Sequence, residues 1–276
     1  MIIMNFQNTA AIHDLSAFGR CALTVVIPVL SAMGIQVIPL PTALLSTHTG
    51  GFDSFSFLDL TDEMEKISAH WDELDLRFSS VYSGFLGSEK QIDTVIRFID
   101  RFKTDDTLVL IDPVMGDNGV PYSTITRGIR DKMKLLARYA DILTPNMTEA
   151  CFLLDLPAET EFTEDMLHRL SDFGPDKVVI TGIDNGGFIT TASYNTQSGE
   201  TVLYNRKPIN KHYPGTGDIF ASVLLGSMMS GMNLTDSSKF ASDFVYDVIA
   251  DTVKYNQPER NGVMLEKNLC KLINRS

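Results

Sequence analysis

The sequence predicts an α/β fold in which a mostly parallel central sheet is covered by helices on both faces. Two observations predict it: short apolar runs alternate with amphipathic helical stretches along the chain, and several apolar runs end in polar clusters. No fixed repeat, low-complexity tract or long flexible linker divides the 276 residues. We therefore expect residues 1–276 to form a single domain, with its ligand site at the carboxyl ends of the parallel strands.

The first half of the chain contains four runs that are typical of buried strands. They are residues 9–13, 35–40, 78–83 and 108–111. Three stretches between them have the apolar spacing of helices, at residues 19–33, 62–74 and 88–102. Gly34 is expected to end the first helix, and Thr61 to cap the second.

The second half continues the alternation. Helices are expected at residues 125–138, 148–154 and 163–173. Buried strands are expected at residues 140–143 and 177–181. Residues 187–193 and 200–205 alternate in polarity and predict an antiparallel pair, whereas the chain from residue 216 onward is mostly helical.

Residues 21–52 contain no Asp, Glu, Lys or Arg, which raises the question of a membrane span. Pro28, Gly34, Pro39 and Pro41 interrupt this stretch, so no apolar run reaches the roughly 18 residues that a span needs. We interpret it as a buried helix followed by a buried strand.

Charge and cysteine content exclude several classes of protein. Lys and Arg total 23 against 35 Asp and Glu, and the net charge of −12 is unsuited to binding nucleic acid. Cys21, Cys151 and Cys270 have no metal-binding or disulfide spacing, which is typical of a reducing compartment. The amino terminus lacks the basic start and apolar core of a signal peptide, so we expect a cytoplasmic protein without a membrane partner.

The strongest motif is Gly215-Thr216-Gly217-Asp218, which precedes an apolar helix. Glycines let backbone amides approach a ligand, and a helix amino terminus favours an anion. Asp218 in that turn suits a base that deprotonates a hydroxyl attacking phosphorus, with the amides stabilising the developing charge. A glycine turn with an acidic helix cap explains these four residues equally well when they are considered alone.

Two further clusters follow expected strands. Asp112 and Asp117 flank a glycine after residues 108–111, where carboxylates could position Mg²⁺ or the phosphates of a nucleotide. A βα turn explains this cluster better when it stands alone, because Asp, Asn, Gly and Pro are turn residues. Thr144, Asn146 and Glu149 form the other cluster; Asn146 could simply cap a helix, and Glu149 could hold a metal-bound water.

Polar residues also gather near the amino terminus. Asp14 is expected to follow the first strand, and residues 46–51 read Ser-Thr-His-Thr-Gly-Gly. Hydroxyls and a carboxylate at strand ends suit a polar aromatic or sugar-like substrate. A single histidine such as His48 is more often a structural hydrogen-bond partner than a base. The chain contains no GxxxxGK[ST], GxSxG or HExxH motif, and no GxGxxG follows the first strand.

These motifs, taken in order, resemble the pyridoxal (vitamin B6) kinase family of the ribokinase superfamily. The resemblance spans nearly the whole chain and rests on AIHDLSAFGR, LLSTHTGG, DPVMGDNG, TPNMTEA, VVITG and PGTGDIFA. It implies a three-layer α/β/α ribokinase-like fold. It also implies transfer of phosphate from ATP, with Mg²⁺, to the 5′-hydroxymethyl group of pyridoxal, pyridoxine or pyridoxamine.

The resemblance also assigns roles by position. Asp218 is similar to the family's catalytic base, and the amides of Gly215, Thr216 and Gly217 to its anion hole. Metal binding falls to Asp112 and Glu149. The implied nucleotide contacts are Asp117, Tyr122, Thr144, Asn146 and Thr181. The implied substrate contacts are Asp14, Ser16, His48, Thr49 and Phe85. A monovalent cation such as K⁺ and a homodimer are further expectations of this resemblance.

The chain departs from the family pattern in three places. Asp14 stands where members often have serine, so its contact with the substrate ring would differ. The segment after residue 117 is short, and Tyr122 would cover the phosphates from there. Phe85 replaces a tyrosine found in some members.

Two alternatives stay open at this stage. Hydroxymethylpyrimidine (phosphate) kinases share several of the motifs, but many have cysteine at the position of Asp218. A non-catalytic B6-binding paralogue would need neither Asp218 nor Glu149, and the sequence retains both.

Overall fold

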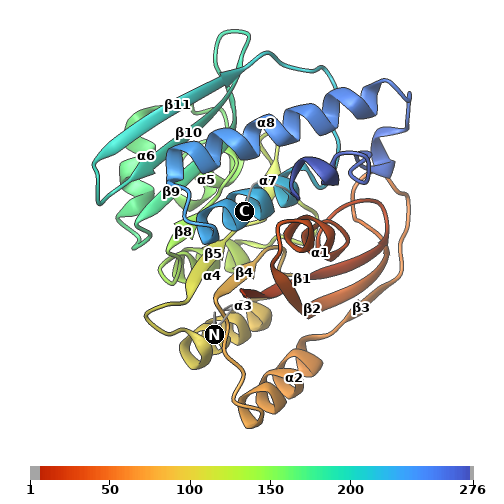
Figure 1. Ribbon diagram of the computed structural model, residues 1–276, viewed down its shortest axis with the longest axis vertical. Helices are drawn as coiled ribbons and strands as arrows, with labels where there is room; N and C mark the ends of the chain where they lie inside the picture. The colour runs from red at the N-terminus through yellow and green to blue at the C-terminus, as the bar shows by residue number, and fades with distance from the viewer. Residues whose placement is uncertain (1–6, 274–276) are drawn as a thin grey trace, which may run out of the picture.

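The computed structural model describes residues 7–273, and within them a nine-stranded sheet runs through the middle of the molecule (Figure 1). The strands are β1 (Asn8–Phe18), β2 (Gln36–Thr47), β3 (Phe57–Asp59), β4 (Ser80–Ser83), β5 (Leu108–Ile111), β6 (Gly116–Asp117), β7 (Val120–Pro121), β8 (Ile142–Leu143), β9 (Lys177–Asp184), β10 (Ile189–Asn195) and β11 (Glu200–Arg206). The sheet order is β11-β10-β9-β8-β5-β4-β1-β2-β3, and β6 and β7 form a separate hairpin.

The middle of the sheet is parallel. Strands β9, β8, β5, β4, β1 and β2 run in one direction, whereas β3, β10 and β11 at the two edges pair antiparallel. This confirms the mostly parallel sheet and the antiparallel pair expected near residues 187–205. The carboxyl ends of the parallel strands consequently meet along one edge, where the polar clusters of the sequence lie.

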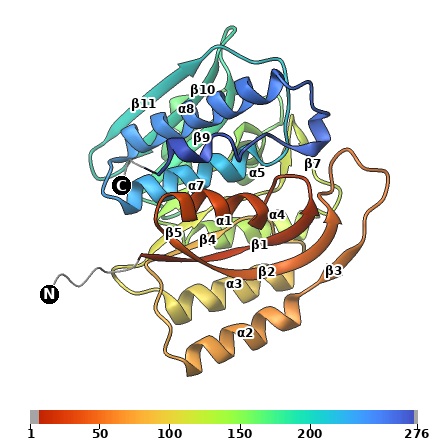
Figure 2. The same cartoon turned by 45° about the vertical axis from the view of Figure 1, so that its right-hand side comes forward.

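Helices cover both faces of the sheet. They are α1 (Leu23–Ala32), α2 (Thr61–Glu73), α3 (Glu89–Phe102), α4 (Arg127–Ala137), α5 (Met147–Leu153), α6 (Glu164–Ser171), α7 (Thr216–Met229) and α8 (Leu234–Val253), with short 3-10 turns at Glu259–Asn261 and Leu269–Lys271. Helices α2 to α6 bury their apolar side chains in one core, and α1, α7 and α8 in another. Figure 2 shows α2 and α3 on one side of β1 and β2, and α1 on the other. The three-layer α/β/α architecture is therefore confirmed.

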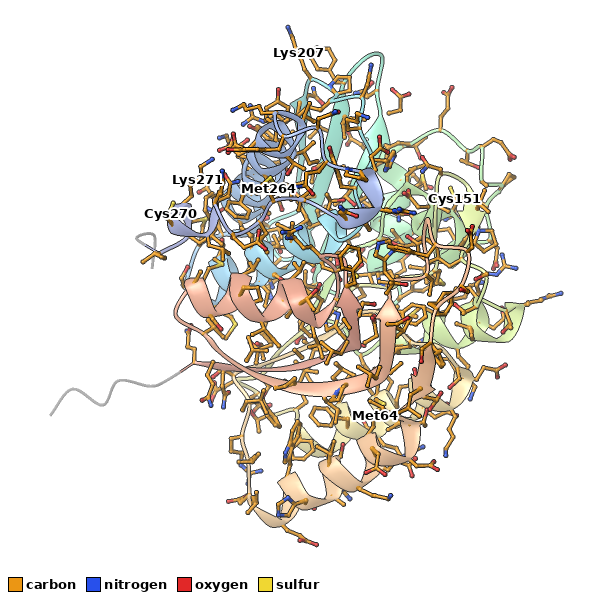
Figure 3. The ribbon with its side chains drawn as sticks, turned by 90° about the vertical axis from the view of Figure 1, so that its right-hand side faces the viewer. Met64, Cys151, Lys207, Met264, Cys270 and Lys271 are labelled. Carbon is orange, nitrogen blue, oxygen red and sulfur yellow. The ribbon has the colours of Figure 1, made fainter. Side chains whose placement is uncertain are left out.

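Strand residues alternate between the two cores, as the pleat of a sheet requires. Val109 and Ile111 of β5 face the first core, whereas Leu110 faces the second. Figure 3 labels Met64 of α2 and Cys151 of α5, both in the first core, and Met264 in the segment after α8. The neighbours of Met264, Val263 and Leu265, belong to the second core, so this segment closes that layer.

The first two strands are longer than the sequence pattern predicts. β1 extends to Phe18, so Asp14 and Ser16 lie within the strand, and the expectation that Asp14 follows it is wrong. β2 continues through two prolines because β3 pairs only with its residues 43–45, which leaves its first half at an edge that tolerates proline. The charge-free stretch is nevertheless a helix followed by a strand, as predicted.

Local chain geometry corrects three other details. Thr61 is the first residue of α2 rather than its cap, and its amide donates to Oδ1 of Asp59. Helix α1 begins at Leu23, because Ala22 has a φ of 49° that is incompatible with the helix. The sequence reading also missed the β6–β7 hairpin, although Asn118-Gly119 is the turn pair that such hairpins favour and both residues have positive φ.

Candidate functional site

The glycine turn before α7 presents a helix amino terminus at the carboxyl edge of the sheet. Gly215 is the residue before the helix and has a φ of 80°. A Cβ atom there would lie 1.9 Å from the carbonyl oxygen of Arg20, so only glycine fits. The first amides of a helix have no partner within it, and those of Thr216 and Gly217 are available to an anion.

Asp218 lies in the first turn of this helix, with its side chain 15 % exposed. The amide of Ala22 donates to its Oδ2 over 2.8 Å, and Nδ1 of His13 is 3.9 Å from its Oδ1. Burial raises the pKa of Asp218 to about 7, the Ala22 amide opposes that rise, and the charge of Asp14 adds to it. A carboxylate with this pKa is suited to take a proton at neutral pH.

Asp14 and Ser16 stand on the part of β1 that extends beyond its pairing with β4. The Ser16 hydroxyl donates to Oδ2 of Asp14 over 2.8 Å, and Asp14 is only 6 % exposed. Burial raises the pKa of the Asp14 carboxyl, and the Ser16 hydrogen bond partly offsets that rise. The structure therefore brings a second buried carboxylate to the region of Asp218.

His48 is held by two hydrogen bonds, which identify its state. The amide of Gly50 donates to Nδ1 over 3.2 Å, so Nε2 carries the proton and donates to the carbonyl of Arg260 over 2.7 Å. The two bonds hold the ring between Gly50 and Arg260, which is the structural role that a single histidine most often has. Thr49 beside it is half-buried. Phe85 follows β4, is half-buried and packs against the first core.

Asp112 and Glu149 form a buried acidic pair beyond β5 and β8. The Met115 amide donates to Oε1 of Glu149 and the Asn146 amide to Oε2, while Asn146 caps α5 in return. Burial raises the pKa of Glu149 to about 8 despite these backbone hydrogen bonds. Burial also raises the pKa of Asp112 well above its usual range, with contributions from Glu149 and Asp218.

This pair has the chemistry of a Mg²⁺ site. Carboxylate oxygens are the ligands that Mg²⁺ prefers, and no Lys or Arg within residues 7–273 forms an ion pair with either acid. The described residues contain no group of three or more His, Cys, Asp or Glu side chains placed to hold a metal. One or two carboxylates suffice for Mg²⁺, which keeps waters and substrate phosphates as its other ligands, so the residues present fit the ion.

The remaining predicted residues line the edge next to this pair. Thr144 has a buried hydroxyl without a hydrogen-bond partner in the described chain, and Thr181 donates its amide to the carbonyl of Pro145. Asp117 lies in the β6–β7 hairpin, where its Oδ2 is 3.8 Å from Nδ1 of His212. Tyr122 follows the hairpin and its side chain is exposed.

The sequence reading missed three contributors to this site. No motif assigns a role to His13, yet its Nδ1 lies 3.9 Å from Oδ1 of Asp218. The Ala22 amide and the Arg260 carbonyl carry no side-chain signal. Only the position of His13, one residue before Asp14 on the first strand, could have pointed to it.

Comparisons with known proteins show which family this chain resembles. Residues 26–262 match the phosphomethylpyrimidine kinase family. A pyridoxal kinase of Arabidopsis thaliana is 32% identical over an alignment that covers 71% of this chain and 66% of that enzyme. A Bacteroides thetaiotaomicron protein described as a candidate phosphomethylpyrimidine kinase, crystallised with pyridoxal, has a TM-score of 0.93 and 44% identity, covering 97% of this chain and 96% of that one.

A pyridoxal kinase structure from Lactobacillus plantarum has a TM-score of 0.90 and 30% identity, covering 97% of this chain and 96% of that chain. The family match includes Asp112, Glu149 and the glycine turn before Asp218. It begins after β1, the strand that carries Asp14 and Ser16. The chain therefore belongs to the phosphomethylpyrimidine kinase family and is a relative of the pyridoxal kinases within the ribokinase superfamily.

Proposed function

We propose that this protein phosphorylates the 5′-hydroxymethyl group of a vitamin B6 vitamer with ATP. Asp218 takes the proton of the hydroxyl, and the resulting oxygen forms a bond to the γ-phosphorus of ATP. The bond from that phosphorus to the β–γ bridging oxygen breaks, so the products are the 5′-phosphate, ADP and a proton. The similarity to pyridoxal kinases supports the choice of substrate.

One observation carries the proposal. Oδ1 of Asp218 is left free while Oδ2 is held by the Ala22 amide, and this carboxylate has a pKa of about 7 at the amino terminus of α7. A base and a set of amide donors therefore stand together at one helix end. Phosphoryl transfer requires both, because one removes the proton and the other stabilises the developing charge.

The neighbouring residues supply the nucleotide side of the reaction. Asp112 and Glu149 would hold Mg²⁺, which neutralises phosphate charge when it is bound. Gly215, Thr216 and Gly217 donate amides to the transferred group. The lining for ATP consists of Asp117, Tyr122, Thr144, Asn146 and Thr181.

The vitamer would lie against β1 and the end of β2. Asp14 and Ser16 offer a carboxylate and a hydroxyl, and Thr49 a second hydroxyl. Phe85 offers an apolar face. His48 positions the segment that carries Thr49 through its hydrogen bonds with Gly50 and Arg260, and it takes no part in proton transfer.

The test is an ADP-release assay with ATP, Mg²⁺ and four acceptors: pyridoxal, pyridoxine, pyridoxamine and hydroxymethylpyrimidine. We expect turnover on at least one vitamer and its loss in Asp218→Asn, which keeps the size of the side chain and removes the base. Near-normal turnover of that variant would contradict the role of Asp218. Absence of turnover on every vitamer by the wild-type protein would contradict the proposed function.

A second candidate is hydroxymethylpyrimidine (phosphate) kinase, which the name of the matching family favours. The chemistry at Asp218 would be the same, so the four-acceptor assay separates the two. Binding of a vitamer without any phosphorylation would instead support a non-catalytic paralogue.

Cellular and quaternary properties stay predictions. No helix within residues 7–273 is both long and apolar enough to cross a membrane. A homodimer and dependence on K⁺ rest on resemblance to the family, and a cytoplasmic location rests on the amino-terminal sequence and the cysteine spacing. Size-exclusion chromatography with light scattering tests the dimer, and replacement of K⁺ by Na⁺ in the assay tests the cation.

A further inference from the structure

The segment between β2 and β3, residues 48–56, is closed at its base by hydrogen bonds. The amide of Ser46 donates to the carbonyl of Ser56 over 3.1 Å, and the amide of Ser56 donates to the Ser46 hydroxyl over 2.8 Å. Gly51 within the segment has a φ of 74°. We call this segment the substrate loop, because it carries Thr49, one of the proposed vitamer contacts. Its ends are fixed, so the position of Thr49 depends on what holds the middle of the loop.

Phe52 holds the middle of the substrate loop through contacts with three side chains. Its ring meets the ring of His48 edge-on at 5.0 Å and the ring of Phe18 edge-on at 6.1 Å. The guanidinium of Arg260 lies over the same ring, 5.4 Å from its centroid. Phe18 ends β1, and Arg260 belongs to the 3-10 turn Glu259–Asn261, so widely separated parts of the chain meet on one ring. We call these four residues the Phe52 cluster.

Arg260 contributes both a charge and a packing surface to this cluster. It forms no ion pair with a carboxylate of residues 7–273, since its neighbour Glu259 pairs with Lys211 over 2.8 Å. A cation above an aromatic ring is attracted by the negative face of that ring. The Cβ atom of Arg260 would lie only 3.2 Å from a Cβ atom added at Gly51, so the loop packs directly on this residue.

The Phe52 cluster adjoins the substrate side of the candidate site. His48 is buried, and a Cβ atom on Gly19 would lie 2.5 Å from its Cδ2, so the ring is packed against the turn that follows β1. Burial raises the pKa of the Asp14 carboxyl, and the charge of His48 is among the effects that oppose this rise. Asp14 in turn adds to the rise that burial causes in the pKa of Asp218. His48 therefore connects the cluster to the carboxylates at which the vitamer is proposed to bind.

We propose that Phe52 and Arg260 are positioning residues that hold the substrate loop in its vitamer-binding position before the vitamer arrives. The proposal rests on the proposed function, because it takes Thr49 as a vitamer contact. Both side chains act through the position of Thr49 and not on the reacting atoms. A loop that is already ordered loses less entropy when a ligand binds, so this ordering raises the affinity for the vitamer and leaves the chemical step unchanged.

Single variants should raise the Kd and KM for the vitamer alone. An aromatic pair changes an equilibrium constant by about 2- to 10-fold, and a cation over a partly exposed ring by about 2- to 5-fold. Phe52→Leu removes the ring that makes all three contacts, so we expect a rise of about 10-fold. Arg260→Met keeps the stem and removes the charge, for which we expect about threefold. Phe52→Tyr and Arg260→Lys keep the ring and the charge and should stay within about twofold of the wild-type protein.

A double variant tests whether the two residues act together. Without the Phe52 ring the Arg260 charge has no partner in the loop. Arg260→Met should therefore raise the vitamer KM about threefold in the wild-type protein and leave it unchanged when Phe52→Leu is already present. Phe188→Leu, at an exposed ring between β9 and β10, and Arg127→Met, at an exposed charge in α4, are the matched controls and should change nothing.

The experiment measures kcat and the KM values for ATP and for whichever of the three vitamers the wild-type protein phosphorylates fastest. Binding of the same vitamer without ATP is measured from its ultraviolet absorbance, which keeps affinity separate from chemistry. We expect kcat and the KM for ATP to change by less than about twofold in every variant. Thermal unfolding checks each variant. Arg260 is exposed, so Arg260→Met still tests the proposal if Phe52→Leu unfolds.

Three results would overturn the proposal. Unchanged vitamer affinity in Phe52→Leu and Arg260→Met would show that the cluster does not position the loop for the vitamer. A fall in kcat, or an equal rise in the KM for ATP, would show a general structural role. Losses that multiply in the double variant would show that the two residues act independently. In each case the wild-type protein still phosphorylates a vitamer. Absence of that turnover with vitamer binding retained would overturn only the proposed function, and absence of both would overturn both.

Discussion

Nδ1 of His13 lies 3.9 Å from Oδ1 of Asp218. The His13 ring is fully buried, meets Tyr82 edge-on at 4.2 Å, and has no hydrogen-bond partner within the described residues on either nitrogen. A Cβ atom on Gly84 would lie 2.3 Å from Nδ1 of His13, so only glycine leaves room for this ring. Burial lowers the pKa of His13 to about 3, and the ring is therefore neutral beside the proposed base.

The pH dependence of turnover follows from this pairing. A neutral His13 provides no positive charge to hold Asp218 ionised, so the carboxyl keeps its raised pKa of about 7. The base works only when it is deprotonated, so kcat should rise with pH and reach half its maximum near pH 7. The same midpoint with two different vitamers would assign it to the enzyme rather than to the substrate. A midpoint near 4, the ordinary value for an aspartate, would contradict the burial effect.

Asp218→Asn should stabilise the protein at alkaline pH. A carboxyl whose folded-state pKa is raised from 3.8 to about 7 stabilises the fold fully below pH 3.8, and this contribution is lost as the pH rises through 7. Asparagine cannot ionise and can still accept the Ala22 amide. We expect the variant to gain up to about 4 kcal/mol over the wild-type protein at pH 8 and little at pH 4, measured by urea unfolding. An equal difference at both pH values would exclude ionisation of Asp218 as its cause.

Glu149→Gln should weaken the dependence on Mg²⁺. Glutamine has one acceptor oxygen, so it can keep the capping bond from the Asn146 amide but loses the bond from the Met115 amide. Helix α5 should still form, but the negative charge offered to the metal is lost. We expect half-maximal turnover to need about 10-fold more free Mg²⁺, and chelation by EDTA to abolish turnover in both proteins. Glu164→Gln, at an exposed position in α6, is the matched control. An unchanged Mg²⁺ titration in Glu149→Gln would remove this residue from the metal site.

Two variants of His48 distinguish a structural role from a catalytic one. Glutamine can accept the Gly50 amide and donate to the Arg260 carbonyl, so His48→Gln should keep kcat within about threefold of the wild-type value. Leucine can do neither, and His48→Leu should raise the KM for the vitamer while kcat changes little. A general base would behave differently, because its loss lowers kcat by about 100-fold or more in both variants. Steady-state kinetics on one vitamer decides between these patterns.

Gly215→Ala should destabilise the fold strongly. The residue has a φ of 80°, and a Cβ atom would collide with the carbonyl oxygen of Arg20 at 1.9 Å. Both effects act together, so we expect a loss of about 3 kcal/mol or more in the free energy of unfolding. Gly217→Ala is the comparison for stability, since nothing lies within 4 Å of its added Cβ atom. Equal stability of the two variants would show that the chain relaxes around the methyl group added at Gly215 without strain.

The sequence by itself determined the class of fold and identified the motifs on which the proposed site residues rest. Alternating strand and helix patterns depend on neighbouring residues only, so the strands at 108–111 and 177–181 and most helices could be predicted from local spacing. Local sequence also indicated the glycine turn before Asp218 and the helix cap at Asn146. Both are short motifs whose residues lie within one helical turn.

Only the tertiary structure decided how those residues act on one another. The Ala22 amide reaches Asp218 across 196 positions of the chain, and the Arg260 carbonyl reaches His48 across 212, because sheet order and helix packing bring distant segments together. β1 extends past Asp14 because β2 pairs with it there, which no local pattern shows. Burial then sets the charges: the pKa of about 7 at Asp218 and the neutral state of His13 arise from removing water around them, and a linear sequence does not contain that information.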